Sequence, residues 1–138
     1  MPINSAKKAG HRFTIHTDSP SSPIGVLRMM RVAVTRKTRS GKYVLGHDEA
    51  ITVDDAIKAV TINAAWQIFE EDTRGSLEVG KLADFTVLSR NIKKIPPEEW
   101  KSVEIVGTYL AGEPVVNEGW SWRKINLMIQ TIWGMIFD

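Results

Sequence analysis

The sequence of this chain predicts an α/β fold in which helices and short strands alternate. Apolar residues recur at helical spacing over residues 26–34 and again between 53 and 69. Residues 13–17, 83–88 and 102–110 have the length and the β-branched, aromatic or other apolar content of strands. With 138 residues, 43% of them hydrophobic and 25% charged, the composition is that of one globular domain.

The first third predicts a strand, a loop and a helix, in that order. Residues 13–17 alternate apolar and polar side chains and end at Asp18, which a Pro- and Ser-rich loop over 19–23 follows. Residues 26–36 are expected to form an amphipathic helix with a basic outer side. Residues 36–49 carry no sustained period and predict a surface loop.

The clearest helix start is Thr52, with Asp55 three residues later in a pattern like a capping box. A slight break is expected at 61–63 before a second helical stretch through Phe69. Glycines at 75 and 80 then flank a predicted short strand, and an apolar strand follows over 83–88. Residues 102–110 and 114–116, joined by a turn at 111–113, predict a hairpin.

The last segment, residues 118–138, differs from the rest. It holds three of the five tryptophans and is apolar nearly all round from Ile125. We expect a helix from about Trp122 that packs on this chain or on a second copy. The alternative is a disordered extension produced by a shifted reading frame.

Composition excludes several classes of site. The chain has no cysteine, so disulfides and thiolate ligands are excluded and any metal must use His, Asp or Glu. Neither a secretory signal nor a membrane span is predicted, which favours a cytoplasmic protein. Residues 1–47 hold nine Lys or Arg and a single acid, whereas the chain as a whole has 18 basic and 16 acidic residues. This segregation of charge would suit a nucleic-acid-binding site, but the aromatic stacking platforms of such sites are missing. A solvated basic face is therefore the preferred interpretation.

Asp18 is the candidate catalytic residue, because carboxylates just past a strand often belong to the active sites of α/β enzymes. His16 lies two residues earlier and projects to the same side of an extended chain, which makes His16 and Asp18 a possible start of a metal site. A loop role for Asp18 and a packing role for His16 are the alternatives. His11 and His47 are expected to be surface residues.

Four sequence blocks resemble one known family. They are His16-Thr17-Asp18-Ser19-Pro20, Ala33-Val34-Thr35-Arg36, the run from Ile51 to Ala65, and Gly75-Ser76-Leu77-Glu78-Val79-Gly80-Lys81-Leu82-Ala83-Asp84. Over residues 9–117 the chain resembles the C-terminal portion of the metal-dependent amidohydrolase superfamily, in the branch of N-substituted formamide deformylases and exoenzyme regulatory proteins.

The resemblance implies the C-terminal slice of a (β/α)8 barrel with strands of its associated β-sandwich. Residues 1–72 would end the barrel, with 13–17 as the eighth strand, and residues 73–117 would be sandwich strands. Asp18 matches the aspartate that touches the metal and handles the proton of the attacking water. The implied cofactor is a divalent metal, first of all zinc. The other ligands of this metal lie on barrel strands that this sequence does not contain. This chain alone could therefore bind the metal or bind none.

The first hypothesis is therefore a C-terminal fragment of an enzyme that hydrolyses amide or other C–N bonds, inactive by itself. Its expected partners are a small amide-type substrate in the complete enzyme and either a second copy or the missing barrel portion. The alternative hypothesis is a non-catalytic binding, regulatory or oligomerisation module. A nucleic-acid-binding domain is the third and least favoured.

Overall fold

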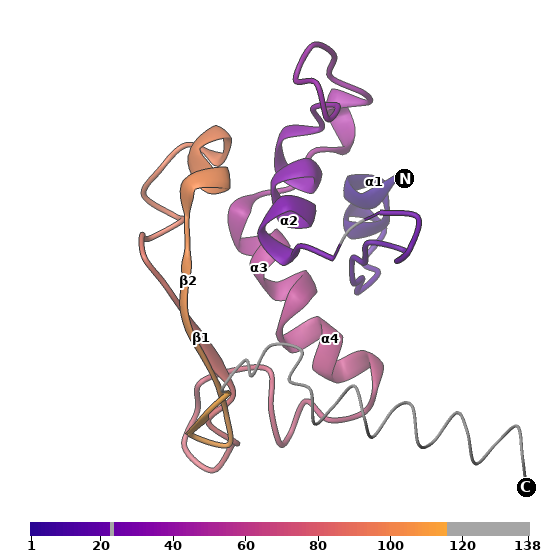
Figure 1. Ribbon diagram of the computed structural model, residues 1–138. Coiled ribbons are helices and arrows are strands. Elements are labelled where there is room, and N and C mark those ends of the chain that lie inside the picture. Colours follow the sequence, from indigo (N-terminus) through magenta and orange to yellow (C-terminus); the bar gives the residue numbers. More distant parts are fainter. Residues whose placement is uncertain (23, 116–138) are drawn as a thin grey trace, which may run out of the picture.

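The computed structural model describes residues 1–22 and 24–115, so the predicted helix within 118–138 lies outside the described residues. Figure 1 shows a group of helices with a narrow antiparallel sheet beside it. The helices are α1 (Ile3–Lys8), α2 (Val26–Thr35), α3 (Val53–Val60) and α4 (Ile62–Gln67), the strands are β1 (Phe85–Leu88), β2 (Ile105–Leu110) and β3 (Glu113–Pro114), and two 3-10 turns are η1 (His47–Glu49) and η2 (Pro97–Ser102).

The helical part follows the sequence prediction closely. The helix predicted over 26–36 is α2, and it ends where Arg36 adopts a left-handed conformation with φ of 55°. Thr52 and Asp55 form the predicted capping box at the start of α3. The break expected at 61–63 is Thr61, whose non-helical backbone separates α3 from α4. Residues 36–49 form the predicted loop, closed by a bridge between Lys37 and Val44.

The sheet has the strand order β1-β2-β3, and both pairs are antiparallel. Phe85 lies opposite Tyr109, and their rings stack with centroids 4.5 Å apart. Ala111 and Gly112, both with positive φ, make the predicted hairpin turn. The prediction of a strand between Gly75 and Gly80 is wrong, because this segment turns: the Lys81 amide donates to the Glu78 carbonyl at 3.1 Å, and no neighbouring strand pairs with it among the described residues.

The strand predicted over residues 13–17 is not formed either. A strand requires a neighbour for its ladder hydrogen bonds, and no described strand lies beside this segment. Side chains of α4 hold it instead. Asn63 Nδ2 donates to the Phe13 carbonyl at 2.9 Å, and Thr14 Oγ1 donates to Gln67 Oε1 at 2.7 Å. The described residues therefore show a small antiparallel sheet, and the barrel slice stays a prediction.

The hydrophobic core lies where α2, α3 and η2 meet. Trp100 of η2 is 1% exposed and packs in one cluster with Met30 and Ala33 of α2 and Ala56 of α3. Its indole Nε1 donates to the Ile92 carbonyl at 3.1 Å. The core thus joins residues from both sides of residue 72, the predicted boundary between the end of the barrel and the sandwich strands. Among the helices that the structure describes, none is long and apolar enough to cross a membrane.

Candidate functional site

Asp18 ends the extended segment and begins a tight loop. Its backbone is left-handed, with φ of 54°. The Asp18 carbonyl accepts a hydrogen bond from the Ser21 amide at 2.9 Å and another from the Ser21 hydroxyl. The side chain of Asp18 is exposed and makes no hydrogen bond or ion pair with the residues described. The loop therefore presents a free carboxylate to the solvent.

A hydrogen bond from the Asp18 backbone amide holds the imidazole ring of His16. The Asp18 amide donates to His16 Nδ1 at 3.1 Å, which assigns the proton of the neutral imidazole to Nε2. A histidine that binds a metal uses one ring nitrogen as the ligand and donates through the other. In the observed arrangement the lone pair at Nδ1 is already used, so His16 does not offer one to a metal.

The two predicted ligands stand apart from the other candidate donors. Over residues 1–22 and 24–115, no three His, Asp or Glu side chains are grouped as a metal site requires. His11 and His47 are exposed, as predicted, and neither joins Asp18. The described residues alone therefore do not fit a catalytic metal. The metal and proton-transfer roles of His16 and Asp18 stay predictions.

The glycine-rich run from Gly75 to Asp84 has a structural role. Asp84 Oδ1 accepts from the Ala111 amide at 2.8 Å, and Arg74 forms ion pairs with Glu70 at 3.1 Å and Asp84 at 3.7 Å. These contacts connect the end of the helical part to the hairpin turn of the sheet. The run is thus the corner between the two parts of the fold.

Lys81 belongs to the same corner. Its ammonium donates to the Glu71 carbonyl at 2.6 Å and to Ser76 Oγ at 2.8 Å, and it lies 3.7 Å from Glu78. Because the ammonium is turned back onto its own loop, it stabilises this corner.

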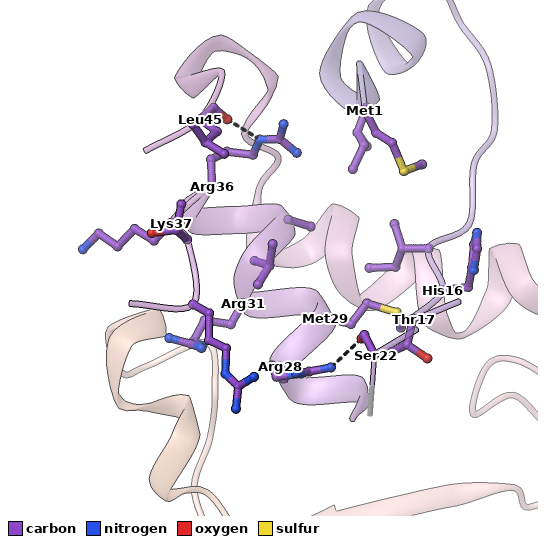
Figure 2. Close-up of a pocket in the computed structure, with 16 residues that line it drawn as sticks. Met1, His16, Thr17, Ser22, Arg28, Met29, Arg31, Arg36, Lys37 and Leu45 are labelled. Atoms are coloured by element: carbon purple, nitrogen blue, oxygen red, sulfur yellow. Dashed lines mark hydrogen bonds between the residues drawn. The ribbon is translucent and has the colours of Figure 1, made fainter. Parts of the chain in front are cut away.

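A second candidate site is a cavity of about 470 Å³, here called the basic hollow. It lies between α1, residues 15–17 and the exposed side of α2 (Figure 2). Its cationic wall consists of Arg28, Arg31, Arg36, Lys37 and Arg39, and its lining includes no acidic residue. The sequence indicated a basic face here but no cavity. The excess of cations in residues 1–47 was the only signal for it.

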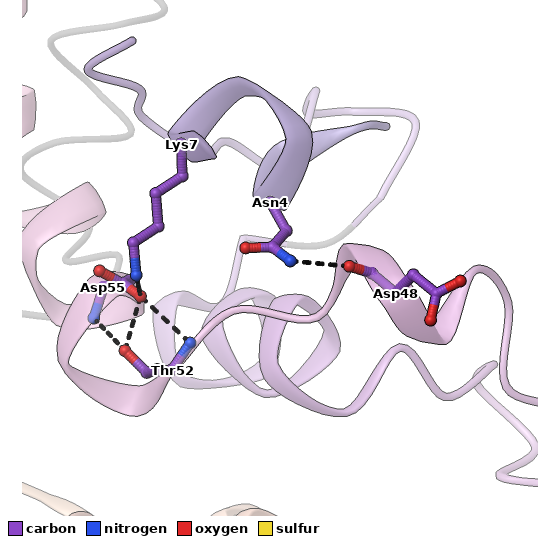
Figure 3. Close-up of polar contacts among 5 residues, drawn as sticks. All are labelled: Asn4, Lys7, Asp48, Thr52 and Asp55. Carbon is purple, nitrogen blue, oxygen red and sulfur yellow. Dashed lines mark hydrogen bonds and ion pairs between the residues drawn. The ribbon is translucent and has the colours of Figure 1, made fainter. Parts of the chain in front are cut away.

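A polar network fixes the wall that α1 contributes to the hollow (Figure 3). Lys7 Nζ lies 2.6 Å from Asp55 Oδ2, which links α1 to the start of α3. Asn4 Nδ2 donates to the Asp48 carbonyl at 2.8 Å, which links α1 to η1. Burial raises the pKa of Asp55, but the hydrogen bonds from Lys7 and Thr52 outweigh it and the net pKa is lowered. The pKa of Glu49 is also lowered, chiefly by the hydrogen bond from Ser5.

Comparisons with known proteins assign this chain to a family. The model of the amidohydrolase family matches residues 1–116. The N-substituted formamide deformylase of Arthrobacter pascens is 33% identical over 112 residues, which are 81% of this chain and 20% of the deformylase. Imidazolonepropionase of Streptococcus gordonii is 36% identical over 118 residues, which are 86% of this chain and 35% of that enzyme.

The fold agrees with that assignment. The structure resembles the crystal structure of an amidohydrolase from Thermotoga maritima MSB8, with a TM-score of 0.62 and 23% identity. The similarity covers 83% of this chain and 25% of the other. The chain thus spans between a fifth and about a third of the length of these relatives. It belongs to the amidohydrolase family.

Proposed function

We propose that this chain is the C-terminal portion of an amidohydrolase that hydrolyses an amide or other C–N bond in a small molecule. The observation that supports this most is the family match over residues 1–116. A second supporting observation is the 33% identity to a protein named as an N-substituted formamide deformylase. The proposal includes a cytoplasmic location and association either with a second copy or with the rest of the barrel.

Asp18 is the residue proposed to move the proton in this reaction. A carboxylate near a water molecule can accept its proton as the water attacks the carbonyl carbon, and can return the proton to the departing nitrogen. The Asp18 side chain is exposed and is not engaged by any described cation. It therefore remains available for this role.

The complete enzyme is proposed to use a divalent metal, with zinc the first candidate, which would polarise the scissile carbonyl and the water. Catalytic zinc sites have three protein ligands. This chain offers at most His16 and Asp18 together, and His16 would have to release the Asp18 amide first. The remaining ligands must come from outside the described residues, so the chain alone is expected to be inactive.

The test uses two proteins. The first is the full chain, incubated with an N-substituted formamide and a divalent metal, for which no turnover is expected. The second is a chimera in which residues 1–116 replace the matching C-terminal region of the Arthrobacter pascens deformylase. We expect the chimera to release formate, and Asp18→Asn to lower its kcat by about 10²-fold or more.

The matched control is Asp72→Asn, which removes an exposed carboxylate that has no partner among the described residues. It should leave kcat unchanged. Turnover by the chain alone would contradict its incompleteness. A folded chimera whose activity survives Asp18→Asn would contradict the role of Asp18, and a folded chimera without any activity would contradict the proposed reaction.

A further inference from the structure

The basic hollow gathers five cationic side chains, and its described surroundings neutralise their charge only in part. Lys37 has an acidic partner, Glu98, at 2.7 Å. Arg36 donates its Nε to the Leu45 carbonyl at 3.0 Å. The guanidinium groups of Arg31 and Arg39 form no hydrogen bond or ion pair with the described residues, although the charge of Arg31 helps to lower the pKa of Glu98. Cations that line one concave surface raise its positive potential together, and an anion that enters the hollow relieves their mutual repulsion.

The arginines suit a planar or tetrahedral oxyanion. A guanidinium group presents its N–H donors as a rigid fork, which binds a carboxylate or a phosphate through two parallel hydrogen bonds. Arg28 and Arg31 lie on α2, and Arg36 is the residue at its C-terminal end, where its guanidinium lies beside Leu45 (Figure 2). Arg28 Nη2 also donates to Ser22 Oγ at 2.7 Å, at the edge of the hollow formed by the loop after Asp18. An anion that enters the hollow therefore meets guanidinium donors in its lining.

The remainder of the lining is apolar. Ile3 of α1, Ile15 of the extended segment, and Met29 and Val32 of α2 face the hollow, and Leu45 closes one end. Val32 is 41% exposed and Leu45 is 62% exposed, so both have apolar surface left to bury. A volume of about 470 Å³ is in the range of small-molecule sites. Burial of a few methylene groups here would contribute about 0.8 kcal/mol for each group.

We infer that the basic hollow binds a small amphipathic anion, in which a carboxylate or phosphate head is joined to a short apolar chain. The head lies against Arg31 and Arg39, and the chain lies along Val32, Met29 and Leu45. Asp18 is not part of the lining, whereas His16 and Thr17, which precede it, are. Binding can also be measured on this chain alone, whereas the hydrolysis requires the chimera.

Calorimetric titration of the full chain with octanoate tests the inference, with octyl phosphate titrated in parallel to compare the two head groups. We expect octanoate to bind more tightly than acetate, which lacks the chain, and than octanol, which lacks the charge. The double variant Arg31→Gln/Arg39→Gln should lower the affinity for octanoate about tenfold or more, because it removes two charge-assisted contacts. Arg90→Gln is the matched control, since Arg90 lies outside the hollow in an exposed pair with Glu99.

Circular dichroism establishes that each variant is folded before titration. Octanoate affinity that is the same in the wild-type chain and the double variant would overturn the inference, as would octanol binding as well as octanoate. A chain that binds a poly-glutamate peptide through these arginines but ignores octanoate and octyl phosphate would also overturn it, because the hollow would then serve an acidic protein segment.

Discussion

Gly75 lies so close to Ala65 that a Cβ atom on the glycine would come within 2.7 Å of the Ala65 Cβ and 2.9 Å of the Ile62 Cα. Gly75 also has φ of +91°, a conformation that L side chains rarely adopt. The chain can therefore turn from α4 into the corner at this position only without a side chain. Packing against α4 therefore explains why the sequence block from Gly75 to Asp84 begins with a glycine.

The first prediction is that Gly75→Ala destabilises the chain by about 2–4 kcal/mol, since it adds overpacking to backbone strain. Gly80→Ala is the matched control, because Gly80 has φ of +94° and no atom within 4 Å of an added Cβ. It should cost only the strain, about 1 kcal/mol. Urea unfolding measures both losses, and equal losses would show that the contact with Ala65 does not matter.

The second prediction concerns Asp55, whose pKa is lowered in the folded chain. A carboxyl group with a lowered folded pKa stabilises the fold above its unfolded pKa, which is about 4, and loses that contribution as the pH falls toward the folded value. The free energy of unfolding should therefore decrease from about pH 5 downward. In Asp55→Asn this decrease should be smaller, while the stability at pH 7 should already be lower by about 1 kcal/mol.

Lys7→Gln tests the partner of Asp55. It should remove part of the same acid dependence and at most about 1 kcal/mol, because Lys7 is 44% exposed. Lys8→Gln is its control, as the neighbouring exposed lysine has no partner among the described residues. Urea unfolding at pH 7 and pH 4 measures the difference. An identical pH dependence in Asp55→Asn and the wild-type chain would refute the assignment.

Local chemistry explains which parts of the fold could be predicted from the sequence. The capping box needs only Thr52 and Asp55, three residues apart, and the hairpin needs only its turn and two short strands. The capping box and the hairpin turn were predicted correctly, whereas β2 begins at Ile105 rather than at the predicted residue 102, which belongs to η2. Residues 13–17 were predicted as a strand because local alternation indicates an extended chain but not whether a neighbouring strand exists.

The candidate sites were predictable to different degrees. Asp18 and His16 are two residues apart, and the described contact between them runs from the Asp18 backbone amide to His16 Nδ1, which could not be foreseen from the sequence. The basic hollow depends on α1 and Ile15 lying against α2, which are contacts between distant segments. Sequence composition revealed its charge, but only packing revealed its shape.

The third prediction concerns Trp100, which joins η2 to α2. Trp100→Ala should destabilise the chain by about 3–5 kcal/mol through the cavity that it leaves. Trp100→Phe keeps most of the volume but removes the donor to the buried Ile92 carbonyl, at a cost of about 1–3 kcal/mol. Trp66→Phe is the control, because Trp66 is 38% exposed, and its cost should be below that of Trp100→Phe in urea unfolding. The reverse order would contradict the position of Trp100 in the core.

The last prediction concerns apolar side chains that the described fold leaves uncovered between residues 68 and 77. Ile68 is 62% exposed, Phe69 is 90% exposed and Leu77 is 75% exposed. Exposed apolar surface of this kind favours association, because each large side chain gains about 1.5–3 kcal/mol when it is fully buried. We expect the full chain to sediment as an oligomer at tens of micromolar, and Phe69→Asp to shift it toward the monomer. Tyr43→Asp changes a residue that is 67% exposed in the 36–49 loop and should leave the oligomer intact. A wild-type chain that sediments as a sharp monomer would contradict the expectation, and an equal response to both variants would place the contact elsewhere.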